Sequence, residues 1–170
     1  MHSTFNCIDN YVFELYLLRV LDQFSGDGIV LDNALAFWMY RANQALRNES
    51  YREFRERGIE LTPEQWMILV RLWEREGRSQ NDLCDSTFRD RPTMSRILDG
   101  MERRSLVVRR ADPNDKRSRL IYLTPSAQGL KKQLVPVVRK LVTRALRGVS
   151  RQNLETTRRT LRAIFENLES

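Results

Sequence analysis

Apolar and polar positions alternate with a helical period along most of the chain. Asp32–Arg57 contains neither Gly nor Pro, and its apolar residues recur at roughly helical spacing: Leu35, Met39, Ala42, Leu46 and Phe54. One long helix is therefore expected, and Gly58 follows where helices usually end. Residues 1–30 are interpreted as an N-terminal arm, in which Tyr11–Leu21 has the pattern of a short helix.

A second helix is expected to begin at Thr62-Pro63-Glu64-Gln65. Thr62 is a good capping residue, Pro63 suits the first helical position, and Gln65 completes a capping box. The apolar stripe that follows consists of Trp66, Ile68, Leu69, Leu72 and Trp73, and Gly77 ends the pattern.

Two shorter helices are expected next. Ser79 begins a helix of about two turns, and Asp90 caps another over "RPTMSRILDGMERR". The apolar residues of this last helix are spaced i, i+3, i+4 and i+7, which is a clean amphipathic stripe. They are Met94, Ile97, Leu98 and Met101. The opposite face carries Pro92, Ser95, Arg96, Asp99 and Arg103.

The rest of the chain predicts a hairpin and two helices. "LVVRR" and "RLIYL" read as strands around an Asp112–Arg117 turn. Helices are expected over residues 124–147, with a kink at Pro136, and over residues 150–168. The predicted fold class is mainly α with a small β-hairpin (α+β). The two outermost helical regions show more apolar surface than one small domain covers, which favours a dimer.

Charge divides the chain into different parts. Residues 1–88 hold 9 Lys and Arg against 14 Asp and Glu, a net charge of −5. Residues 89–119 hold 10 against 5, and residues 131–170 hold 10 against 3, so the chain carries +7 overall. A basic half points to nucleic acid. Alternatively, the basic C-terminal helices pair with acidic helices, within the chain or across a dimer.

A short helix, an amphipathic helix and a basic hairpin form the layout of a winged helix-turn-helix. A helix fits the DNA major groove, and Thr93, Ser95 and Arg96 supply hydrogen-bond donors on its polar face. The hairpin then reaches the minor groove, whose negative potential favours Arg. Phosphate would compensate the repulsion among the hairpin's basic residues, which are Arg109, Arg110, Lys116, Arg117 and Arg119.

The stretch "DRPTMSRILDGMERRSLVVRRADPNDKRSRLIYLT" resembles the core of the MarR family of bacterial transcriptional regulators. The family's D-x-R wing motif is matched by Asp115-Lys116-Arg117, and its closing L-x-x-L-T by Leu120–Thr124. The order of elements over residues 31–168 is also similar. Ser105 departs from the family, which usually has Gly there because the position often needs a positive φ. The arm at residues 1–30 has no counterpart in the family's minimal form.

The resemblance implies a ligand-responsive, sequence-specific repressor that binds a palindromic operator in double-stranded DNA as a homodimer. Residues 31–57 and 124–168 would form the dimerisation helices, and residues 62–123 the winged helix-turn-helix DNA-binding part. The DNA-binding residues would be Arg91, Thr93, Ser95, Arg96, Arg103, Lys116, Arg117 and Arg119. On this pattern Arg117 enters the minor groove and Asp115 supports the wing.

The signal that the protein senses is expected to be a small aromatic or phenolic molecule. "LDNALAFWMY" resembles the start of the family's organic-hydroperoxide sensors, but Ala36 stands at the position of their reactive Cys. Cys84 is interpreted as a core residue, and a redox role for Cys7 is weakly supported. A ligand pocket would be lined by Phe37, Trp38, Tyr40, Arg41 and Trp66, although these side chains also suit a plain core.

Other functional classes find little support. The sequence has no Gly-rich phosphate loop and no nucleophile–histidine pair, so no enzyme and no cofactor are expected. The only His is His2, which argues against a metal sensor. No long apolar run or secretion signal is visible, so a cytoplasmic protein without a membrane partner is expected. The rival interpretations are a nonspecific architectural DNA-binding protein and a protein-interaction module.

Overall fold

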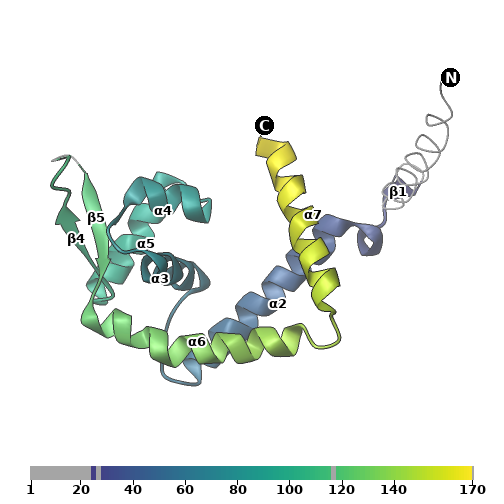
Figure 1. Ribbon diagram of the computed structural model, residues 1–170, viewed down its shortest axis with the longest axis horizontal. Helices are drawn as coiled ribbons and strands as arrows, with labels where there is room; N and C mark the ends of the chain where they lie inside the picture. Colours follow the sequence, from purple (N-terminus) through teal and green to yellow (C-terminus); the bar gives the residue numbers. More distant parts are fainter. Residues whose placement is uncertain (1–23, 26–27, 116–117, 170) are drawn as a thin grey trace, which may run out of the picture. The chain divides into compact units, whose positions relative to one another are not determined.

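The computed structural model describes residues 24–25, 28–115 and 118–169 (Figure 1). The predicted arm helix at Tyr11–Leu21 and the wing residues Lys116 and Arg117 lie outside this description. The chain divides into two compact units, Met1–Arg47 and Asn48–Ser170. The predicted fold class is confirmed, since the structure is mostly helical with a small antiparallel sheet.

The described part of the first unit contains two strands that the sequence did not predict. Strands β1 (Phe24–Ser25) and β2 (Gly28–Ile29) pair antiparallel, and a short 3₁₀ turn, η2 (Leu31–Asn33), follows. Helix α2 (Leu35–Arg55) begins three residues after the predicted Asp32, because Ala34 is extended, with φ −78° and ψ 119°. The end of α2 belongs to the second unit.

Local capping signals set the starts of the next three helices at Thr62, Ser79 and Asp90, as predicted. Helix α3 (Pro63–Glu74) starts at Thr62, where both hydrogen bonds of the capping box are present. Helix α4 (Gln80–Thr87) has a second capping box, between Ser79 and Asp82. Helix α5 (Arg91–Arg103) is capped by Asp90. These interactions span three residues each, so the sequence alone identifies them.

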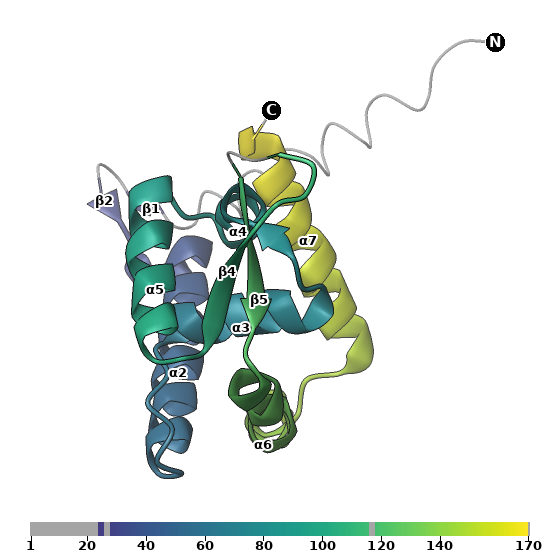
Figure 2. The same cartoon turned by 90° about the vertical axis from the view of Figure 1, so that its left-hand side faces the viewer.

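The sheet has three strands in the order β3-β5-β4 (Figure 2). Strands β4 (Val107–Ala111) and β5 (Arg119–Leu123) form the predicted hairpin, with Val107 opposite Leu123. Strand β3 (Arg78–Ser79) was not predicted, because its two residues are held only by pairing with β5. It follows Gly77, whose φ is +68°; a side chain there would meet Tyr122, whose Oη lies 3.0 Å from the Cβ position.

One hydrophobic core lies beneath the sheet and among the helices of the second unit. Its fully buried members come from the end of α2, the residue before α3's cap, helices α3 to α6 and the two long strands: Phe54, Leu61, Ile68, Leu69, Leu72, Leu83, Met94, Leu98, Met101, Val107, Ile121, Ala127 and Leu134. The predicted stripe of α5 therefore faces this core, except that Ile97 is only partly buried. Trp66 and Trp73 of the α3 stripe are also only partly buried.

The C-terminal helices are longer and less covered. Helix α6 (Pro125–Ala145) is capped by Thr124 and runs without interruption through Pro136, so the predicted kink stays a prediction. Helix α7 (Arg151–Glu169) begins after Ser150, whose Oγ accepts a hydrogen bond from the Asn153 N–H at 3.1 Å. No residue of α7 is buried.

Ser105 adopts φ +53°, so the positive φ expected at this position is confirmed. Its carbonyl accepts hydrogen bonds from the hydroxyls of Thr124, at 2.6 Å, and Ser126, at 3.1 Å. The turn after α5 is thus tied to the start of α6, which offsets part of the strain of a non-glycine residue in this region.

Candidate nucleic-acid interface

Helix α5 presents a polar, basic face outward from a firmly anchored base. Its inner residues Met94, Leu98 and Met101 are fully buried. Three predicted DNA-binding residues, Arg91, Arg96 and Arg103, are exposed, and Ser95 and Thr93 are half-buried. The structure therefore brings the predicted α5 residues onto one element with a rigid attachment to the core.

The start of α5 is organised by Asp90. Its carboxylate accepts the Thr93 N–H at 2.7 Å and the Thr93 hydroxyl at 2.9 Å. These two hydrogen bonds, the backbone one first, hold the pKa of Asp90 below its usual value. Thr93 Oγ1 also accepts from Arg96 at 3.4 Å. The Thr93 hydroxyl proton is therefore donated to Asp90 within the cap. The sequence analysis had expected this hydroxyl to donate to DNA.

A groove of about 490 Å³ lies beside α5, between it and the start of α3. Its lining residues are Thr62, Glu64, Gln65, Arg89, Thr93, Arg96, Ile97 and Gly100. Arg89, which the sequence analysis did not single out, lies 3.8 Å from Glu64 across this groove. Two Arg side chains at its edges make the groove suitable for a phosphate group.

The wing turn is held by hydrogen bonds of Asp112 and Ser118. The Asp112 carboxylate accepts the Asn114 N–H at 2.8 Å, and the Asp112 N–H donates to the Ser118 carbonyl at 3.2 Å. The carbonyl of Asp115 accepts the Ser118 N–H at 2.9 Å. Sequence analysis correctly began the turn at Asp112 but assigned the supporting role only to Asp115; an Asp side chain that bonds to the backbone N–H two residues later is a typical turn signal.

Arg109 is engaged within the domain instead of projecting from the wing. Its guanidinium lies 2.7 Å from Asp99 and also contacts Glu102, both on α5, and its backbone N–H donates to Glu102 at 3.3 Å. The Arg109 side chain is only 22% exposed. The expectation that Arg109 neutralises phosphate is therefore not supported. Instead, Arg109 joins β4 to the last turns of α5.

The remaining described basic residues of the hairpin stay accessible. Arg110 is exposed and lies over the Tyr122 ring, with 4.8 Å between the guanidinium carbon and the ring centroid. Arg119 is exposed opposite Ala111. These two cations flank the Asp112–Ser118 turn, so the described part of the wing keeps a basic surface.

The predicted ligand-pocket residues fall into both units. In the first unit, Arg41 lies over the rings of Phe37 and Trp38, at 5.5 and 5.7 Å from their centroids, and Tyr40 is exposed. In the second unit, Trp66 packs against Phe54 and Trp73 at ring distances of 5.3 and 5.5 Å. Trp66 therefore serves the core, and a shared pocket stays a prediction.

Cys84 is buried within α4, and burial is the main cause that raises the pKa of its thiol, followed by the charge of Asp85. This matches the interpretation of Cys84 as a core residue. The described residues contain no cluster of three or more His, Cys, Asp or Glu suited to a metal ion. None of the helices in the described part of the chain is long and apolar enough to cross a membrane.

Comparison with known proteins agrees with this geometry. Residues 61–118 match the MarR family model. The organic hydroperoxide resistance transcriptional regulator of Bacillus subtilis (strain 168) is 26% identical over 144 residues, which cover 85% of this chain and 93% of that protein. A probable transcriptional regulator from Pseudomonas aeruginosa is 32% identical, with a TM-score of 0.71, over 79% of this chain and 99% of that one.

Two solved structures of the repressor CouR are also similar. CouR from Rhodococcus jostii RHA1 bound to p-coumaroyl-CoA is 25% identical, with a TM-score of 0.71, over 79% of this chain and 94% of that one. CouR bound to a 23-mer DNA duplex is 26% identical, with a TM-score of 0.65, over the same shares. These relatives are regulators and not enzymes, and the chain belongs to the MarR family of DNA-binding transcriptional regulators.

Proposed function

We propose that the protein is a sequence-specific repressor that binds a palindromic operator as a homodimer, with one winged helix-turn-helix on each half-site. The observation that carries this proposal is α5, whose inner stripe is fully buried while its outer face is basic and lies beside a basic hairpin. A helix held this rigidly keeps its side chains in register with base edges. The binding of CouR to DNA supports the same use of the fold.

The side chains divide between the two grooves. Ser95 and Arg96 would read base edges in the major groove, with Arg91 and Arg103 at the two ends of α5. Arg117 would enter the minor groove, braced by Asp115, while Lys116 and Arg119 neutralise phosphates. Thr93 would contribute through the cap that orients Arg96, because its hydroxyl already bonds to both Asp90 and Arg96.

Homodimerisation would use the terminal helical regions, residues 31–57 and 124–168. The apolar stripe of α7 consists of Leu154, Leu161, Ile164, Phe165 and Leu168, and none of these residues is buried. Exposed apolar stripes of this length usually mark an interface. Two copies related by a two-fold axis would match the symmetry of a palindrome.

The effector would be a small aromatic or phenolic molecule bound near Phe37, Trp38, Tyr40 and Arg41. A cation over two aromatic rings suits a flat, anionic ligand. The p-coumaroyl-CoA complex of CouR supports this class of effector. The protein would act in the cytoplasm, where the operator is.

Capture of genomic DNA by the purified protein, followed by sequencing, tests the proposal. A repressor of this kind enriches a small set of fragments that share one palindrome. A nonspecific architectural protein enriches fragments without a common sequence, and a protein-interaction module enriches none. Either of the last two results would contradict the proposed function.

A further inference from the structure

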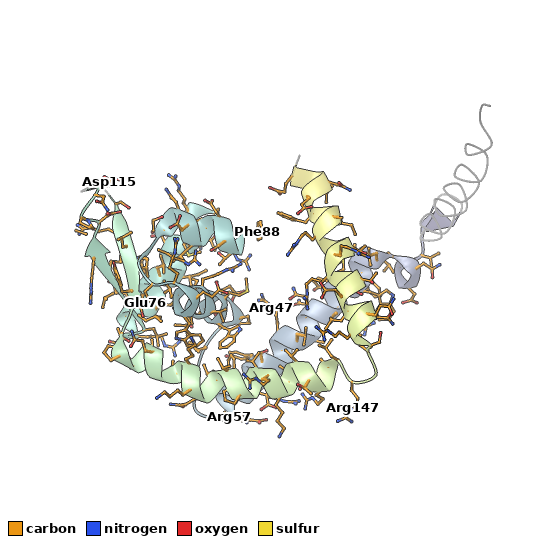
Figure 3. All side chains as sticks on the ribbon, in the orientation of Figure 1. Arg47, Arg57, Glu76, Phe88, Asp115 and Arg147 are labelled. Atoms are coloured by element: carbon orange, nitrogen blue, oxygen red, sulfur yellow. The ribbon has the colours of Figure 1, made fainter. Side chains whose placement is uncertain are left out.

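The second half of α6 carries a basic groove of about 760 Å³ that the DNA-binding surface does not use. We call it the α6 groove. Its lining residues are Glu53, Pro136, Arg139, Lys140, Leu141, Thr143, Arg144, Leu146 and Arg147. In Figure 3 the labelled Arg147 lies at the end of α6, far from Asp115 at the wing.

Three cations of the groove share one face of α6, and a fourth follows the helix. Arg139, Lys140 and Arg144 lie within about 140° of each other at about 100° per residue, and Arg147 lies just beyond the end of α6. Lys140 and Arg144 are four residues apart, a spacing at which like charges repel. The arrangement is therefore unfavourable unless negative charge is nearby.

Most of this positive charge is not balanced within the described part of the chain. Arg144 forms an ion pair with Glu49 of α2. Arg139, Lys140 and Arg147 make no ion pair with any described residue. Glu53, the acidic lining residue, already bonds to Arg57 at 2.8 Å. The groove thus presents three exposed cations that have no ion-pair partner among the described residues.

A favourable interaction with the helix dipole explains only part of the cluster. Cations in the last turn of a helix are stabilised by its C-terminal carbonyl groups. This applies to Arg144 and to Arg147 just beyond the end of α6. Arg139 and Lys140 lie more than one turn before the end, where the effect has faded.

We propose that the α6 groove binds a small polyanion, a molecule with two or more phosphate or carboxylate groups. Arg and Lys form charge-assisted hydrogen bonds with such groups, and Arg139 and Arg147 offer bidentate donors. Thr143 supplies a hydroxyl, and Leu146 and Pro136 line the groove with apolar surface. The groove has the volume of ordinary small-molecule sites, which is about 300–1,000 Å³.

This site is separate from the operator-binding surface. At about 1.5 Å per residue, Arg139 lies about 20 Å along α6 from Pro125, which follows the wing. A small ligand cannot span that distance, so its binding does not depend on the DNA contacts proposed above. The inference goes beyond the proposed function because it names a ligand site away from the DNA. The groove lies within the regions proposed for dimerisation, so the sedimentation control below distinguishes a ligand site from an interface between copies.

Calorimetric titration of the full chain with inorganic tripolyphosphate, and separately with citrate, at constant ionic strength tests the site. We expect saturable binding of at least one, and the better ligand distinguishes a phosphate from a carboxylate source. The Arg139→Gln/Lys140→Gln variant should bind at least about tenfold more weakly, because it removes two charge-assisted donors. The matched control Lys131→Gln/Lys132→Gln removes the same charge from α6 outside the groove, and should bind within about twofold of the unmodified protein.

Four results would overturn the proposal. Neither anion saturates the unmodified protein, or both double variants lose affinity equally, which would indicate attraction by net charge alone. The groove variant dissociates a dimer in sedimentation, which would make the groove an interface between copies. Finally, the groove variant lowers operator affinity and flattens its salt dependence, which would make the groove part of the DNA surface. Thermal unfolding of both variants checks that they fold, and exposed substitutions should change little.

Discussion

Helices α5 and α7 have equally regular amphipathic patterns but very different surroundings. In α5, Met94, Leu98 and Met101 are fully buried against the core. In α7, no residue is buried, and Phe165 and Leu168 are 42% and 81% exposed. The same pattern thus describes a helix whose apolar face is already covered and one whose apolar face is open.

An apolar stripe therefore predicts a helix with one buried face. It does not predict whether the same domain or another chain covers that face. The stripe of α5 packs on elements that are close in sequence, chiefly α4 and β4. Among the described residues, the aromatic ring contact of α7 joins Phe165 to Phe88, with 5.0 Å between the centroids. We therefore expect the stripe of α5 to control stability and the stripe of α7 to control association.

The largest expected effect is on folding. Leu98→Ala removes a fully buried side chain of α5, and should lower the free energy of unfolding by about 2–5 kcal/mol. Denaturant unfolding at fixed protein concentration measures this loss. Arg91→Ala, on the exposed face of the same helix, is the control and should stay within about 0.5 kcal/mol. If Leu98→Ala dissociates the dimer without destabilising the fold, the comparison is wrong.

The corresponding change in α7 should act on association. Ile164→Asp places a charge in the stripe of α7, and burying it against a second copy costs several kcal/mol. We expect the dimer to weaken at least about 100-fold, towards the 20.2 kDa chain in sedimentation. Arg159→Asp, on the opposite face of α7, should leave the dimer intact. A dimer unchanged by Ile164→Asp would contradict the predicted role of α7.

Features that depend on neighbouring residues were predictable from the sequence. The capping residues Thr62 and Asp90 and the positive φ at Ser105 involve only local geometry, and the structure bears them out. Strand β3 and the engagement of Arg109 were missed, because both depend on partners brought together by the fold. The sequence marked Arg109 as basic but could not reveal Asp99 beside it.

In the candidate site, too, the sequence predicted features that follow from local spacing and missed those that depend on contacts. The sequence placed Arg96 on the outer face of α5, where it is exposed, because helical spacing fixes that face; Ser95, at the edge of the same face, is half-buried. It did not reveal that the Thr93 hydroxyl serves the cap, or that Arg89 borders a groove with α3. These properties depend on side-chain choice and on packing between helices, which a pattern does not encode.

The wing provides the next test, because it should affect DNA binding and leave dimerisation alone. Arg117→Ala should weaken operator binding by about 1–3 kcal/mol. Two wings per dimer would then flatten the slope of log K against log salt by about 2. Fluorescence anisotropy over a salt series measures both quantities, and Lys116→Ala should be milder. Asp115→Ala should also weaken binding; if it tightens binding while Arg117→Ala has no effect, the wing assignment is wrong.

A smaller effect is expected at Arg109, which links the wing to α5. Arg109→Ala removes the ion pairs with Asp99 and Glu102, and should weaken operator binding by about 1 kcal/mol, because the wing loses its fixed position. Since Arg109 is engaged within the domain, the salt slope should stay unchanged. The same anisotropy series distinguishes the two roles. A slope that flattens by about 2 would instead identify Arg109 as a phosphate contact.

The smallest expected effect concerns oxidation, and it tests whether the packing around α4 keeps the Cys84 thiol away from solvent. Cys84 is 7% exposed, and burial raises the pKa of its thiol, so the reactive thiolate is scarce at neutral pH. Ala36 stands where the resemblance to hydroperoxide sensors places a reactive Cys. Cumene hydroperoxide at pH 7 should therefore leave operator affinity unchanged.

Because the pKa of the Cys84 thiol is raised, any reaction of Cys84 with the hydroperoxide should increase as the pH rises above the ordinary thiol range. Loss of binding at pH 7 that reductant reverses would refute this, and Cys7→Ser and Cys84→Ser variants would then identify the responsible thiol.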